Sequence, residues 1–249
     1  MQMPPFKLER YFARYEFNIE HLLCASDCES LAIQDLLALE PDAAERFHRH
    51  WLGYTESMGK PSLRKEICRL YHDIHPNQVL VHTGAEEAIF LFMHAVLNAK
   101  DHVIVQSPCY QSLAEIARSI GCRVSWWNVH EDNGWALDID ELKHSIQSDT
   151  RAIIINTPHN PTGYLMPSEL FQMVNRIARE NGIILFSDEV YRESEYQKED
   201  RLPAACELGE HSVSLGVMSK TYGLPGLRIG WIATQNEAVC NGMAALKDY

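Results

Sequence analysis

Short apolar segments alternate along this chain with longer segments of helical periodicity, and this alternation constrains the fold more than any other feature. Residues 152–155, Ala-Ile-Ile-Ile, have no polar position and are typical of a strand covered on both faces. The predicted strands are 78–82, 102–106, 123–127, 152–156, 183–187, 212–218 and 227–234. The predicted helices are 62–74, 86–98, 111–120, 138–148 and 167–180. The order predicts an α/β fold in which helices cover both faces of a mixed, mostly parallel seven-stranded sheet.

The charge balance disfavours two classes of partner. The 249 residues include 22 Lys and Arg against 34 Asp and Glu, a net charge of −12. A strongly acidic surface repels nucleic acid and anionic lipid. The longest apolar run, residues 88–97, contains His94 and is too short to cross a bilayer. We therefore expect no nucleic acid and no membrane among the partners, and a small molecule as the ligand.

The seven cysteines predict a reducing compartment. Their number is odd, they form no CxxC pair, and a chain of this size needs no disulfides for stability. The N-terminal residues have no apolar stretch fit for a signal peptide, so we expect a cytoplasmic location. The histidine pairs His48-x-His50 and His72-x-x-His75 have neither the HExxH form nor cysteine partners, so no metal site is predicted.

In open α/β sheets, ligands bind beyond the carboxyl ends of the strands, so polar residues that follow predicted strands are candidates for a site. The first group is His-Thr-Gly-Ala-Glu-Glu, residues 82–87. Gly84 allows a tight turn, and the free backbone N–H groups of Ala85 and Glu86 at a helix start can bind phosphate. The alternative is an ordinary strand-to-helix turn whose acids suit the helix start.

The second group is Ser107-Pro108-Cys109-Tyr110. The proline ends the strand and presents Tyr110 at the edge of the sheet. Its aromatic face suits stacking on a flat heterocycle, although this group taken alone favours packing of Tyr110 on the following helix.

The third group is Asn-Thr-Pro-His-Asn-Pro-Thr-Gly, residues 156–163. Two prolines and a glycine fix a stiff, bent loop. Such a loop can hold the Asn160 amide toward an oxygen on a ligand ring with little loss of entropy. The alternative is a turn whose asparagines cap backbone groups.

The fourth group, Ser187-Asp188-Glu189-Val190-Tyr191, ends an apolar strand. An acid at the end of a buried strand needs a partner, and a cationic ring nitrogen is one. Asp188 would then favour the protonated ring, while Tyr191 would donate to an oxygen on that ring. Capping of the next helix is the alternative role for the acid.

The fifth group, residues 219–231, reads Ser-Lys-Thr-Tyr-Gly-Leu-Pro-Gly-Leu-Arg-Ile-Gly-Trp. Lys220 follows an apolar strand, and we expect a semi-buried amine that is neutral and able to attack an aldehyde. Arg228 follows a Gly- and Pro-rich bend, and its planar guanidinium suits phosphate. The spacing fits neither a P-loop nor a dinucleotide fingerprint. A surface pair of Lys and Arg is the structural alternative.

Together, GAEEA, SPCY, NTPHNPTG, SDEVY and SKTYGLPGLRIGW resemble the class I/II aminotransferases, which are fold-type I enzymes dependent on pyridoxal 5′-phosphate (PLP). The resemblance covers about residues 50–235 and is specific, because five separate loops agree in identity and order. It implies that Lys220 forms a Schiff base with PLP and moves a proton, and that Asp188 pairs with the pyridine nitrogen. It also implies that Asn160 and Tyr191 hold the 3′ oxygen and that Tyr110 stacks on the ring.

The resemblance also implies how the phosphate is held. Arg228 and the backbone amides of Ala85 and Glu86 would bind it. Many relatives carry Ser or Thr where this chain has Val217, so we expect that one phosphate hydrogen bond is either missing or replaced by Ser219.

The domain organisation follows from the same resemblance. Residues 51–235 would form the PLP-binding large domain, and residues 1–50 would belong to the small domain and the dimer arm. Residues 236–249 would begin the interdomain helix, and the C-terminal part of the small domain would be absent. Tyr54 resembles the tyrosine that reaches the phosphate of a neighbouring subunit, which implies a homodimer with shared sites.

The resemblance favours transfer of an amino group between an amino acid and a 2-oxo acid. Two alternatives stay open. Residues 22–29, Leu-Leu-Cys-Ala-Ser-Asp-Cys-Glu, are not the commonest aminotransferase text, which favours a PLP-dependent lyase or cyclase. Relatives continue much further beyond the lysine, so a truncated form that binds PLP without turnover is the other alternative.

Overall fold

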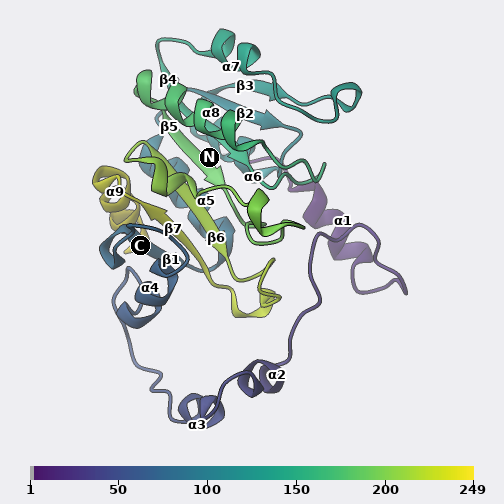
Figure 1. The fold of residues 1–249 in the computed structure, drawn as a ribbon, viewed down its shortest axis with the longest axis vertical. Helices are drawn as coiled ribbons and strands as arrows, with labels where there is room; N and C mark the ends of the chain where they lie inside the picture. Colours follow the sequence, from purple (N-terminus) through teal and green to yellow (C-terminus); the bar gives the residue numbers. More distant parts are fainter. Residues whose placement is uncertain (1–2) are drawn as a thin grey trace.

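A seven-stranded mixed sheet forms the centre of the computed structural model, which describes residues 3–249 (Figure 1). The strands are β1 (Val79–His82), β2 (His102–Ser107), β3 (Arg123–Asn128), β4 (Thr150–Asn156), β5 (Ile184–Asp188), β6 (Ser212–Val217) and β7 (Gly230–Thr234). Their order in the sheet is β1-β7-β6-β5-β4-β2-β3. Only β7 runs antiparallel to its neighbours β1 and β6, so the predicted fold class is confirmed.

Helices cover both faces of the sheet. The helices are α1 (Lys7–Tyr15), α2 (Ile33–Ala38), α3 (Ala43–His48), α4 (Pro61–Cys68), α5 (Gly84–Val96), α6 (Ser112–Ile120), α7 (Ile139–Ser145), α8 (Ser168–Glu180) and α9 (Glu237–Lys247). The apolar core on one face includes residues of α5, α6 and α9, and the core on the other face includes residues of α7 and α8.

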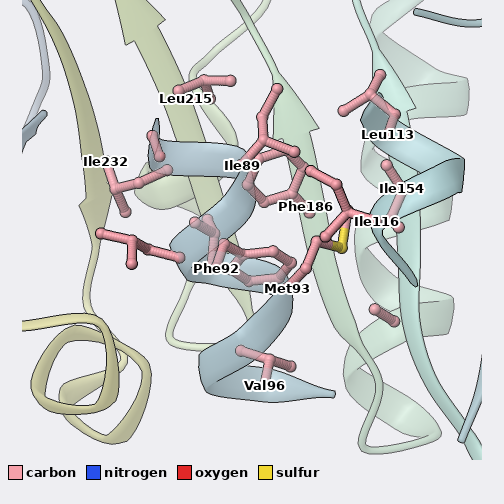
Figure 2. Packing of buried hydrophobic residues seen from close by; sticks show 14 of the residues in the cluster. Ile89, Phe92, Met93, Val96, Leu113, Ile116, Ile154, Phe186, Leu215 and Ile232 are labelled. Atoms are coloured by element: carbon pink, nitrogen blue, oxygen red, sulfur yellow. The ribbon is translucent and has the colours of Figure 1, made fainter. Parts of the chain in front are cut away.

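Alternate residues of the central strands supply these two cores. Ile154 of β4 packs with the α5 side, in the cluster that Figure 2 shows with Phe186 and the α6 residues Leu113 and Ile116. Ile153, its neighbour in β4, packs with the α7 and α8 side. This two-sided burial explains why residues 152–155 carry no polar side chain, since each fully buried Ile contributes about 1.5–3 kcal/mol.

Several predicted boundaries are wrong by a few residues. The strand predicted from residue 227 begins at Gly230, because Pro225–Leu227 form a 3₁₀ turn and Arg228 adopts a left-handed backbone conformation with φ of +50°. The helix predicted over 62–74 ends at Cys68. These ends are set by turns whose geometry the hydrophobic period does not report.

The segment between α1 and α4 lies apart from the sheet. Figure 1 shows the chain leaving α1, passing through α2 and α3 away from the helices and strands of the core, and returning to α4. Two backbone hydrogen bonds join this segment to the body, from the Leu31 N–H to the Gly223 oxygen at 3.1 Å and from the Val81 N–H of β1 to the Met58 oxygen at 2.9 Å.

The sequence predicts no membrane-spanning segment, no metal site and no disulfide, and the structure of residues 3–249 bears on each of these predictions. Within residues 3–249, every helix is too short or too polar to cross a bilayer. In the same residues, no group of three or more His, Cys, Asp or Glu side chains is placed to hold a metal ion. All seven cysteines are unpaired in the structure.

Gly216 of β6 faces the indole of Trp231, and we expect its replacement by alanine to destabilise the fold. A Cβ at Gly216 would lie 2.4 Å from the indole Cε2, and Trp231 is fixed because its Nε1 donates to the Tyr71 hydroxyl at 2.7 Å. Overpacking of this kind costs about 1–3 kcal/mol, which urea unfolding would measure. The control is Gly226→Ala, because a Cβ there meets nothing within 4 Å. Equal stability of the two variants would contradict this account of the contact.

Candidate active site

The carboxyl ends of the parallel strands bring the predicted loops to one edge of the sheet. Asn156, the last residue of β4, pairs with Asp188, the last residue of β5, and Asp188 pairs with Leu215 of β6. The 156–163 loop, the 188–191 turn and the Ser219-Lys220 pair therefore leave neighbouring strands at the same edge, as expected for parallel strands.

At this edge, the start of α5 and Arg228 form a cradle for an anion. Gly84 opens the helix with φ of +81°, and a Cβ there would lie 2.5 Å from Arg228 Nη2. The guanidinium therefore occupies the space that a side chain at Gly84 would fill. The first-turn amides of Ala85 and Glu86 have no partners within the helix, and a positive guanidinium beside them suits a phosphate. The 3₁₀ turn and the left-handed Arg228 bring the arginine back to this point.

A second arrangement joins an amide to a phenol. Asn160 Nδ2 donates to the Tyr191 hydroxyl at 2.9 Å. Asn156 holds the loop in place, because its Oδ1 accepts from the Asn160 N–H at 2.7 Å and its Nδ2 donates to the Asp188 backbone oxygen at 2.9 Å. Asn156 is buried, so these bonds are shielded from water and fix the Asn160 amide.

Asp188 is an acid in a buried place, with 5% of its surface exposed. Burial, with a smaller contribution from the Glu86 carboxylate, raises the pKa of its carboxyl to about 7. A hydrogen bond from the Val190 N–H, at 3.2 Å, and the charge of Lys220 oppose the rise. Through the bond from Val190, the Asp188 carboxylate caps the short turn that follows β5, which is part of the capping role given as the alternative for this acid. A buried carboxyl with one backbone donor retains capacity for a cationic partner.

Lys220 lies where the sequence predicts, with 24% of its side chain exposed. Its Nζ forms an ion pair with the Asp27 carboxylate, lies 3.4 Å from Ser26 Oγ, and stands 5.9 Å from the centre of the Tyr191 ring. The semi-buried position is as expected. The environment differs from the expected one, because the amine meets a carboxylate rather than an apolar wall.

Tyr110 packs on the N-terminal segment. Its ring centre lies 5.0 Å from that of Phe6, and its hydroxyl donates to Glu9 Oε1 at 3.2 Å. The neighbouring Glu86 carboxyl accepts from Ser112 Oγ at 3.2 Å, and burial raises its pKa. Tyr110 thus reaches the edge that the sequence predicts, but Phe6 is the aromatic partner of its ring in this structure.

Two predicted residues differ sharply in exposure. Ser219 is buried beside Lys220, with 8% of its surface exposed. Tyr54 is fully exposed on the segment between α3 and α4, and the structure does not bring it to the other site residues.

Three residues of this edge were missed in the prediction from sequence. Ser26 and Asp27 touch Lys220, and Asn156 fixes the Asn160 loop. The unusual sequence of residues 22–29 was a signal for Ser26 and Asp27. Asn156 lay within the predicted loop and had no role assigned.

The groups at this edge fit a phosphorylated ligand with a flat ring and a basic ring nitrogen. Arg228 and the free amides of α5 suit the phosphate, and a Cβ at Gly84 would fill that cradle. The buried Asp188 suits the ring nitrogen, and Lys220 suits an aldehyde. Residues 20–248 match the family described as Aminotransferase class I and II, and the chain belongs to that family. PLP is the cofactor of this family.

Known proteins of two kinds are similar to this chain. An aspartate aminotransferase of Pyrococcus horikoshii is 30% identical over 80% of this chain and 52% of its own length. A capreomycidine synthase of Streptomyces vinaceus is 26% identical over 99% of this chain and 64% of its own length. A crystal structure of a PLP-dependent aminotransferase from Streptococcus suis has a TM-score of 0.92 and 32% identity, over 100% of this chain and 67% of that one. The chain spans about half to two thirds of the length of these relatives.

Proposed function

We propose that the protein transfers an amino group between an amino acid and a 2-oxo acid with PLP as cofactor. The observation that carries this proposal is the convergence of Lys220, Asp188 and Arg228 on one edge of the sheet, with Arg228 over the start of α5. Membership in the aminotransferase family supports the same chemistry.

The proposed cofactor contacts follow from the position of each group. Arg228 and the amides of Ala85 and Glu86 hold the phosphate. The buried Ser219 hydroxyl is a further donor, in place of the Ser or Thr hydroxyl that many relatives carry at the position of Val217. These donors are a guanidinium, helix amides and a hydroxyl, which together neutralise and orient a phosphate.

The ring is proposed to lie between the other residues. Asn160 and Tyr191, already joined by a hydrogen bond, hold the ring oxygen, and Tyr110 supplies an aromatic face in place of its contact with Phe6. Asp188 keeps a proton on the ring nitrogen, since a buried carboxylate gains a cation as partner.

When bound, PLP supplies an aldehyde that amines can attack and a ring that withdraws electrons from the α-carbon of the substrate. Lys220 would hold the cofactor through Nζ, and its amine would carry the proton that leaves the substrate α-carbon. Asp188 has no proposed contact with the substrate and acts on the ring nitrogen alone.

The assembly and domain organisation are proposals as well. Residues 51–235 form the PLP-binding large domain, and residues 1–50 form an arm that belongs to the small domain and the dimer. The full exposure of Tyr54 supports a role in a partner's site, as in a homodimer with shared sites. A cytoplasmic location accords with seven unpaired cysteines.

A second candidate function is elimination or cyclisation of an amino acid. The similarity to the capreomycidine synthase supports it, because that relative is named for a synthesis and not for amino-group transfer and the similarity covers 99% of this chain. The same lysine and aspartate serve both reactions.

A test of the proposed function joins a spectrum with a nitrogen balance. We expect the purified protein with PLP to absorb in the visible range and, after borohydride, to carry the label on the peptide that contains Lys220. With a ¹⁵N-labelled amino acid, the label should appear in the amino acid made from an added 2-oxo acid. Release of ammonia without a 2-oxo acid would favour elimination. A label on another lysine would contradict both candidates.

A further inference from the structure

A segment of the N-terminal region, residues 23–31, lies against Lys220 and the loop that follows it, and we name this segment the strap. Two contacts tie its end to the loop that follows Lys220. The Leu31 N–H donates to the Gly223 oxygen at 3.1 Å. Gly223 has φ of +64°, and a Cβ there would lie 2.7 Å from the Glu29 oxygen, so the strap and the loop are in close contact. The strap is therefore part of the site.

The strap surrounds the Lys220 nitrogen with groups that bind an ammonium ion. Asp27 gives a carboxylate in an ion pair, and Ser26 gives a hydroxyl at 3.4 Å. The Ser26 hydroxyl also accepts from the Tyr191 hydroxyl at 2.8 Å, and the Tyr191 ring stands 5.9 Å from Nζ. A carboxylate, a hydroxyl oxygen and an aromatic ring are the groups that stabilise an ammonium in proteins. The ion pair of Lys220 with Asp27 shows that this position accepts an ammonium group.

In the proposed function, Lys220 Nζ leaves its position beside Asp27 and Ser26. When Nζ bonds the cofactor it ceases to be an ammonium, and the Asp27 carboxylate loses its partner. Among the other acids of this edge, Asp188 has the ring nitrogen as its partner in the proposed function, while Glu86 accepts from Ser112 and Glu9 accepts from Tyr110. Asp27 is thus the acid that faces an arriving cation. Substrate and lysine nitrogens exchange at the same carbon, so the substrate amine must arrive close to the position that Nζ leaves.

We propose that Ser26 and Asp27 dock the α-ammonium group of the amino donor before it reacts. This inference rests on the proposed function and names the first binding step of that site. The strap then recognises every amino donor by its α-ammonium group, which all donors share, and not by its side chain. A 2-oxo acid has no ammonium group, so the strap separates donor from acceptor.

The first experiment titrates the PLP-loaded protein with amino donors. We expect Asp27→Asn to raise the dissociation constants of L-alanine, L-aspartate and L-arginine by about tenfold or more, and to a similar degree, as read from the cofactor absorbance. Ser26→Ala should raise them less, because a neutral hydrogen bond is weaker. Asp35→Asn, which changes an exposed acid of α2, is the control. Inhibition by pyruvate or 2-oxoglutarate should be unchanged or tighter in Asp27→Asn.

The second experiment needs no cofactor and no turnover. In the cofactor-free protein, Asp27→Asn removes the carboxylate that pairs with Lys220 Nζ. We expect trinitrobenzenesulfonate to modify Lys220 several-fold faster in this variant at pH 8, because the amine is released from the ion pair and no carboxylate beside it repels the anionic reagent. Mass spectrometry of the Lys220 peptide follows the modification. Circular dichroism would check that the fold is retained, and Asp35→Asn should leave the rate unchanged.

Four results separate this proposal from the proposed function. Unchanged donor affinity in Asp27→Asn, with a responsive wild-type protein, would overturn the docking proposal alone. An effect on L-arginine and not on L-alanine would overturn it too, because it would mean side-chain recognition. An unchanged Lys220 modification rate would show that the strap does not hold the ammonium. No response of the loaded wild-type protein to any amino acid would end the proposed function and this inference together.

Discussion

Lys220→Ala is expected to abolish amino-group exchange, with a loss of about 10⁴-fold or more. The variant removes the nitrogen that bonds the cofactor and the group that carries the substrate proton, and general acid–base catalysis by itself contributes about 10²–10⁴-fold. Arg228 cannot take over, because a guanidinium stays protonated. The measurement is transfer of ¹⁵N from an amino acid to a 2-oxo acid, together with borohydride labelling, which should disappear from the Lys220 peptide.

The control for this variant is Lys198→Ala, which removes an exposed lysine of the 3₁₀ turn Lys198–Asp200. It should retain exchange and labelling. Added methylamine should restore part of the activity of Lys220→Ala, because it supplies a small amine in the same space. Retention of a borohydride-stable label by Lys220→Ala would mean that another lysine bonds the cofactor, and the site assignment would be wrong.

Asp188→Asn is expected to stabilise the cofactor-free protein at pH 8 while it lowers exchange by at least about 10²-fold. Burial raises the pKa of this carboxyl to about 7, so the folded protein binds the proton more tightly than the unfolded chain. Stability therefore falls as pH rises from about 4 to about 7, and above pH 7 the full cost of a buried charge is present. Asparagine removes that cost, which the shift from 3.8 to about 7 places at about 4 kcal/mol.

Urea unfolding of the cofactor-free proteins at pH 5 and pH 8 measures this effect. The variant and the wild type should differ little at pH 5, where the wild-type carboxyl is protonated, and clearly at pH 8. Part of the wild-type pH dependence should remain in the variant, because burial also raises the pKa of Glu189 to about 7. Asp132→Asn, at an exposed acid, is the control. A variant less stable than wild type at pH 8 would mean that Asp188 has a cationic partner within the protein.

The sequence predicted the strands and the main loops of the site because both depend on local patterns. A run such as residues 152–155 reports burial on both faces, and the polar groups that follow β4, β5 and β6 meet at one edge whenever those strands are parallel. Lys220, Asp188 and Asn160 were found in this way. The bend at residues 223–228 carried its own signal in two glycines and a proline, and Arg228 returns to the start of α5 as expected.

The amino-acid sequence by itself therefore determined the α/β class, the family and the chemical groups at the sheet edge. Only the tertiary structure decided that Asp27 meets Lys220 and that Phe6 packs on Tyr110. Asp27 and Lys220 are 193 residues apart, and no periodicity or turn residue links them. Hydrophobic period and turn chemistry act over a few neighbouring residues, whereas an ion pair between distant residues depends on how a long segment without regular structure lies across the finished sheet.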